Sequence, residues 1–123
     1  MTRGSAGEGL ARVQAEIEKE KSEALGRAGE RLEGAIRALR LLGQEVGALE
    51  AGHATPADPV EPGEAVERRR AEYAALRRQA RLYHHYLIVQ REALGFRKHG
   101  DVDRLYPVPG PLAGPPGGRR GAP

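Results

Sequence analysis

Two long stretches of the chain carry apolar residues at alternating steps of three and four positions. In the first stretch the stripe runs without interruption from Leu25 to Leu49, and no proline occurs between residues 8 and 51. This spacing puts the apolar side chains on one helix face and is the a/d pattern of a coiled coil. The stripe consists of Leu25, Ala28, Leu32, Ala35, Leu39, Leu42, Val46 and Leu49. We therefore predict a helix over residues 8–51.

The second stretch has the same spacing and follows a proline-rich break. Residues 52–63 contain three Pro and two Gly, which predicts the end of the first helix and a reversing loop over residues 52–62. The spacing then continues through Val66, Arg69, Tyr73, Leu76, Ala80, Tyr83, Leu87, Gln90 and Leu94. We predict a second helix over residues 63–98, with Gly95 capping or kinking its end.

These two elements predict an all-α fold, an antiparallel two-helix coiled-coil hairpin. If the helices lie side by side about the loop, the sequence numbers of two residues that face each other add up to roughly 115. We call this the facing rule. It places Ala35 opposite Ala80 and Ala28 opposite Leu87. Charge favours the pairing, because residues 8–51 hold nine Glu against seven Lys or Arg, whereas residues 62–98 hold nine Lys or Arg against four Glu.

The ends of the chain have different patterns. Residues 1–7 are small and polar, and we expect them to be disordered. Residues 101–106, which we call the clasp, predict one helical turn with Asp101 as its N-cap and Pro107 after it. Residues 107–123 are rich in Pro and Gly, which predicts an extended or disordered tail with polyproline II tendency. This tail is either an inert low-complexity end or a segment that docks into a groove of another protein.

A short apolar patch precedes the main stripe. Leu10, Val13 and Ile17 also step by three and four, but they lie one residue out of phase with the stripe that begins at Leu25. The charged residues 18–23 separate the two. The facing rule places this patch opposite the end of the second helix and the clasp, so we expect contacts with Phe96, Val102, Leu105 and Tyr106.

The second helix carries more apolar and aromatic surface than a two-helix hairpin can cover. Ile88 and Val89 lie off the main stripe and should point away from the first helix. Exposed apolar area of this kind usually marks an interface, and we expect a homodimer that forms a four-helix bundle, together with binding to another protein. The expected interface residues are Tyr83, Tyr86, Ile88, Val89, Phe96, Leu105 and Tyr106. Alternatively, the tail folds back and covers Ile88 and Val89.

The charge balance favours a protein partner over nucleic acid. The formal net charge is only +3, from 20 basic and 17 acidic residues, whereas nucleic-acid binders usually show a larger or more clustered excess. The basic face of the second helix still allows contacts with nucleic acid or another polyanion. The residues expected to make them are Arg68, Arg69, Arg70, Arg78 and Arg81. The competing interpretation is that this face forms ion pairs with Glu residues of the first helix.

Catalytic and metal-binding patterns do not occur in the sequence. There is no Cys, and the only serines, Ser5 and Ser22, are expected on a terminal tail and on an exposed helix face. His84 and His85 are adjacent and would diverge by about 100° on a helix, which is unsuitable for binding one ion. We expect no catalytic residues, no metal and no cofactor.

The expected function is that of a non-enzymatic interaction protein: an oligomerising adaptor or scaffold, or a small chaperone-like module. No apolar run is long enough to span a membrane, and the N-terminal residues lack the apolar region of a secretory signal. We therefore expect a cytoplasmic protein. The runner-up is a basic accessory protein that binds a polyanion.

Overall fold

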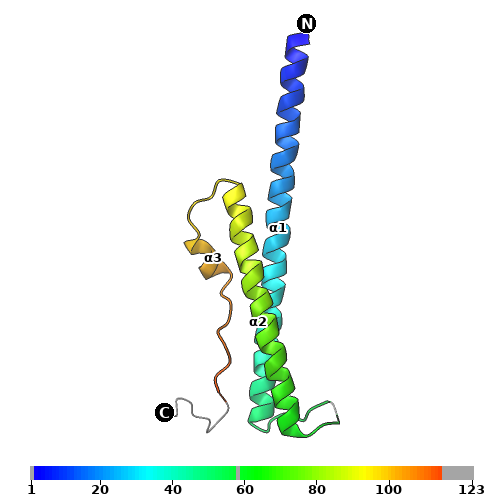
Figure 1. The fold of residues 1–123 in the computed structure, drawn as a ribbon, viewed down its shortest axis with the longest axis vertical. Coiled ribbons are helices and arrows are strands. Elements are labelled where there is room, and N and C mark those ends of the chain that lie inside the picture. Colours follow the sequence, from blue (N-terminus) through cyan, green and yellow to red (C-terminus); the bar gives the residue numbers. More distant parts are fainter. Residues whose placement is uncertain (1, 58, 115–123) are drawn as a thin grey trace.

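The fold consists of helices and the segments that join them. The computed structural model describes residues 2–57 and 59–114, with side chains from residue 7 onwards. Three helices are present in this part of the chain: α1 (Thr2–Glu50), α2 (Pro62–Ala93) and α3 (Gly100–Leu105). Figure 1 shows α2 running back alongside the C-terminal part of α1, whose N-terminal end extends well beyond it. The prediction of an all-helical protein with two long, mutually packed helices is confirmed for the described residues.

Glycine ends both long helices in the same way. Gly52 has φ of +76° and Gly95 has φ of +95°, a conformation that residues with a β-carbon rarely adopt. After α1, the amide of His53 donates to Ala48 O at 2.8 Å, and after α2 the amide of Phe96 donates to Arg91 O at 3.0 Å. These bonds, with the shorter ones made by the glycine amides, form Schellman motifs that satisfy the last helical carbonyls.

The helix bounds differ from the expected ones by more than one residue at two ends. α1 begins at Thr2, so that residues 2–7, expected to be disordered, are helical, while Met1 lies outside the described residues. α2 ends at Ala93 and does not reach residue 98, because the turn at Gly95 stops it. The clasp forms α3 as expected, but its N-cap is His99, and Asp101 lies within the first turn.

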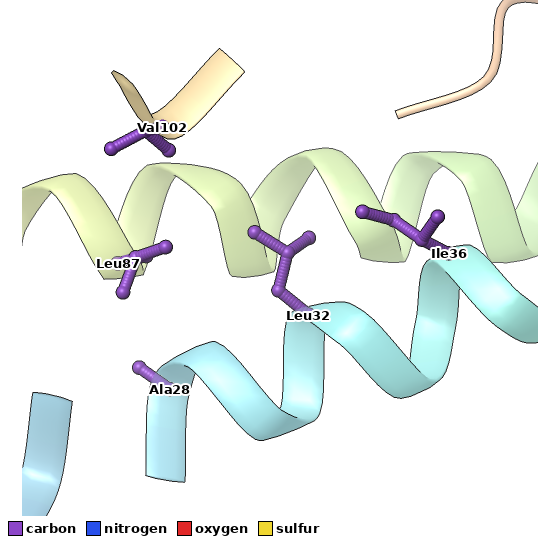
Figure 2. Close-up of a cluster of buried hydrophobic side chains, with 5 residues drawn as sticks. All are labelled: Ala28, Leu32, Ile36, Leu87 and Val102. Carbon is purple, nitrogen blue, oxygen red and sulfur yellow. The ribbon is translucent and has the colours of Figure 1, made fainter. Parts of the chain in front are cut away.

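Two clusters of buried apolar side chains make up most of the core. The first joins Ala28, Leu32 and Ile36 of α1 to Leu87 of α2 and Val102 of α3 (Figure 2). The second consists of Ala35, Leu39, Tyr73 and Ala80. Ala28 therefore shares a cluster with Leu87, and Ala35 shares one with Ala80, as the facing rule predicted. Alanines at these positions allow the two helix backbones to approach closely.

The clasp does not lie where the sequence placed it. Because the chain reverses after Gly95, α3 runs back along the hairpin, and Val102 is buried against Leu32 and Leu87. The upstream patch is consequently uncovered: the exposed fractions of Leu10, Val13 and Ile17 are 62, 51 and 47%. The expected contact between that patch and the clasp is wrong, since the facing rule assumed that α2 continues straight to residue 98.

Residues 100–112, which we call the return segment, pack against both long helices. Residues 107–114 have no regular secondary structure, in agreement with the expected extended tail, and residues 115–123 lie outside the described part. Val108 and Leu112 nevertheless pack against the core clusters. The tail thus folds back as the alternative interpretation suggested, but Val89 stays 46% exposed.

Ion pairs link the two long helices. Arg69 Nε lies 2.7 Å from Glu45 Oε2, and a terminal nitrogen of Arg70 lies 2.6 Å from Glu50 Oε2. Both pairs join a basic residue of α2 to an acidic residue of α1, which agrees with the charge pattern of the sequence. Within the described residues, no helix is long and apolar enough to cross a membrane.

Candidate interaction surface

A row of polar side chains on α2 binds the return segment. The hydroxyl of Tyr73 donates to Gly110 O at 2.7 Å, and Arg77 Nε donates to Pro109 O at 2.8 Å. A polyproline-like segment has no internal hydrogen bonds, so its carbonyls need other donors. These two bonds therefore hold the segment against α2. The sequence placed Tyr73 in the core but showed no sign of its hydroxyl contact or of the role of Arg77.

Arg91 organises the turn between α2 and α3. Its Nε donates to His99 Nδ1 at 3.2 Å, and a terminal nitrogen donates to Lys98 O at 3.0 Å. The guanidinium also lies over the ring of Phe96, 4.6 Å from its centroid. One residue thus contacts three residues of the turn, and one of them is Phe96, an expected interface residue.

Three of the expected interface residues pack against other parts of the same chain. Tyr83 is half-buried between the two core clusters, with the guanidinium of Arg31 5.5 Å from its ring centroid. Ile88 and Tyr106 are half-buried against the first cluster. Ile88 therefore does not point away from the core as expected, because the return segment packs on its side of the hairpin. These three side chains stabilise the fold.

The remaining apolar residues of α2 form an exposed stripe. Tyr86 and Val89 are each 46% exposed, and Leu82, which the sequence analysis did not select, is equally exposed. The three are four and three positions apart and so share one helix face. We call them the outer stripe. The sequence contains this spacing, but the longer series of a/d positions from Val66 to Leu94 is the more prominent pattern of the same helix. Phe96 and Leu105 are exposed as well, at 47 and 71%.

The arginines proposed to bind a polyanion divide into two groups. Arg69 and Arg70 are engaged with α1, and the hydrogen bond and charge of Glu45, reinforced by Glu72, raise the pKa of Arg69. Arg68, Arg78 and Arg81 are exposed. Neither Arg78 nor Arg81 forms an ion pair with a residue that the structure describes. The ion-pairing interpretation therefore applies to Arg69 and Arg70.

A shallow hollow of about 530 Å³ lies between α2 and the return segment. Its basic side chains, Arg77, Arg81 and His84, come from successive turns of α2. Within it, His84 Nε2 lies 3.0 Å from Asp103 Oδ1, so the hollow contains one carboxylate as well. Apolar side chains and Pro107 complete the lining. The arrangement places two guanidinium groups and an imidazole beside one carboxylate.

Metal ligands do not cluster in the described part of the chain. No group of three or more His, Cys, Asp or Glu side chains is placed there to hold an ion. His84 contacts Asp103, whereas its neighbour His85 is exposed and lies beside Tyr86. Comparison with models of known families, with characterised proteins and with solved structures gives no match to this chain.

Proposed function

We propose that the protein is a non-enzymatic adaptor or scaffold, an antiparallel coiled-coil hairpin that binds another protein through the outer stripe of α2. The observation that supports this most strongly is the stripe itself. Leu82, Tyr86 and Val89 are almost half exposed on one helix face, and neither α1 nor the return segment covers them. Burial of apolar area contributes roughly 25 cal/mol per Å² before the costs of association are subtracted.

The spacing of the outer stripe suits an amphipathic helix as the partner element. Helices that dock side by side use anchors at steps of three and four, as these three residues provide. Arg78 and His85 are exposed within one turn of the stripe. The complementary helix would therefore carry apolar residues on one face and acidic residues beside them. The return segment packs against a different side of α2 and leaves this face open to a partner.

A photo-crosslinking amino acid in place of Tyr86 tests the proposal in the native host. We expect one dominant crosslinked protein, and we expect Val89→Asp to abolish that product because the added carboxylate would lie in the apolar contact. Ala38→Asp is the matched control, since Ala38 is exposed on α1 and receives the same charge. Equal crosslinking in the Val89→Asp and Ala38→Asp proteins would argue against the outer stripe.

A second candidate function is binding of nucleic acid or another polyanion. The observation that favours it is the hollow with Arg77, Arg81 and His84 along one side, beside the exposed Arg78. Phosphate contacts by such residues would give affinity that falls steeply with salt. The ion pairs of Arg69 and Arg70 with α1 remove two of the arginines that the sequence suggested for this role.

Charge reversal separates the two candidates. Arg78→Glu with Arg81→Glu should eliminate retention on heparin and any salt-dependent binding to duplex DNA if the polyanion function holds. The same double variant should leave crosslinking at Tyr86 intact if the outer stripe carries the function. A wild-type protein that passes through heparin at low salt would contradict polyanion binding directly.

A further inference from the structure

The N-terminal end of α1 is a long helix with an uncovered apolar face. Leu10, Val13 and Ile17 lie on one face, are 47–62% exposed, and belong to the part of α1 that extends beyond α2 (Figure 1). The surface hollow beside Ile17 is lined by residues of α1 alone, from Ile17 to Arg27. Nothing else in the described part of the chain lies against this face.

A lone helix of this kind is poorly stabilised in water. Most helical stability in proteins comes from packing of an apolar face and not from intrinsic propensity. Residues 7–24 include two glycines, Gly7 and Gly9, which each cost about 1 kcal/mol relative to alanine in a helix interior. An apolar stripe along this segment therefore indicates a surface that is covered when the protein functions.

Residues 115–123 are too short a segment to reach and cover the apolar face at Leu10, Val13 and Ile17. The described residues end at Gly114, and Leu112, two residues earlier, lies close to Gly43 in the C-terminal part of α1. Nine extended residues span at most about 32 Å, whereas 26 residues of helix, from Gly43 back to Ile17, span about 39 Å. Residues 115–123, PPGGRRGAP, also contain no large apolar side chain.

The polar residues beside the stripe favour a second copy of the same chain. With Leu10 and Ile17 at heptad position a, Glu16 falls at g and Lys21 at e. In a parallel pair of helices, each g residue lies beside the e residue five positions further along the other helix. Glu16 of each copy would thus pair with Lys21 of the other, twice in a symmetric dimer. A partner helix whose charged residues all had the same sign would leave either Glu16 or Lys21 without an opposite charge.

We propose that the protein dimerises through residues 7–24 of α1, as a parallel coiled coil in which Leu10, Val13 and Ile17 of two copies meet. This contact would extend helix packing along α1 beyond the end of α2, through a patch one residue out of phase with the stripe that begins at Leu25. It is distinct from the outer stripe of α2 and does not depend on the function proposed for it. Glu20 occupies the next d position, so two carboxylates would meet there and weaken the dimer.

Sedimentation equilibrium of the full chain, from low micromolar to near-millimolar protein, tests the proposal. We expect a concentration-dependent doubling of mass and a dissociation constant at least about 100-fold weaker in Ile17→Asp, because that change buries two carboxylates in the seam. Ala15→Asp adds the same charge on the opposite face of the helix and should leave the dimer unchanged. Glu20→Leu removes the repulsion and should tighten it.

Cysteine crosslinking tests the parallel arrangement, since the natural chain has no cysteine. Under mild oxidation, Val13→Cys should form a disulfide-linked dimer efficiently, whereas Ala15→Cys should not. A wild-type protein that stays monomeric at every concentration would overturn the proposal, as would an Ile17→Asp protein with undiminished dimerisation. A Val13→Cys protein that dimerises without crosslinking would overturn the parallel pairing.

Discussion

The hydroxyl of Tyr106 lies against the backbone of Gly29, so closely that a β-carbon on that glycine would be 2.8 Å from it. Gly29→Ala must therefore shift the hydroxyl end of the Tyr106 side chain, which packs against the first core cluster. An added β-carbon at Gly26 would meet nothing within 4 Å. We expect Gly26→Ala to stabilise the protein by up to about 1 kcal/mol through helix propensity, and Gly29→Ala to give a smaller gain or a loss. Urea unfolding of both variants checks this; equal gains would contradict the close approach.

The hydrogen bond between Tyr73 and Gly110 gives a second prediction. Tyr73→Phe keeps the ring in the second core cluster but removes the donor to the Gly110 carbonyl, so we expect a loss of about 1 kcal/mol in the free energy of unfolding. NMR contacts between the Leu112 methyl groups and the residue 73 ring should weaken as well. Tyr86→Phe, at an exposed position, is the control and should change stability by less than about 0.5 kcal/mol.

The turn between α2 and α3 should depend on the planar fork of Arg91. Arg91→Lys keeps the charge but cannot reproduce the two hydrogen bonds to Lys98 and His99 in the same geometry. We expect a loss of about 1–2 kcal/mol and faster amide hydrogen exchange in α3, which the turn positions. Arg97→Lys changes an exposed residue of the same turn and should have no measurable effect. Similar losses in both variants would show that Arg91 has no special role.

Burial separates the two large apolar residues of α3. Val102 is 1% exposed in the first core cluster, whereas Leu105 is 71% exposed. Val102→Ala removes two buried methyl groups and leaves a cavity, so we expect a loss of about 2 kcal/mol. Leu105→Ala should change stability by less than about 0.5 kcal/mol, although it deletes a larger side chain. Thermal unfolding followed by circular dichroism measures both, and the reverse order of losses would place α3 elsewhere on the hairpin.

The candidate site was only partly visible in the sequence. Tyr86 and Val89 were selected from their apolar character, and the structure places both on an exposed face with Leu82. Tyr83 and Ile88 have the same character but are half-buried, because the return segment packs on that side of α2. A linear pattern shows which residues share a helix face. It does not show which face a segment from elsewhere in the chain will cover.

The sequence alone determined that the described part of the chain forms two long helices that pack against each other. Heptad spacing is a local property that can be read from the sequence. Once a loop reverses the chain, the rise per residue along each helix sets which residues come to the same level. Ala28 and Leu87, for example, belong to the same core cluster. Only the tertiary structure decided the path of residues 94–114, which follow α2. That path depends on a positive φ at Gly95 and on hydrogen bonds from Tyr73, Arg77 and Arg91 to distant backbone and ring atoms, which no periodicity records. Those contacts direct α3 back along the hairpin and leave the N-terminal end of α1 uncovered.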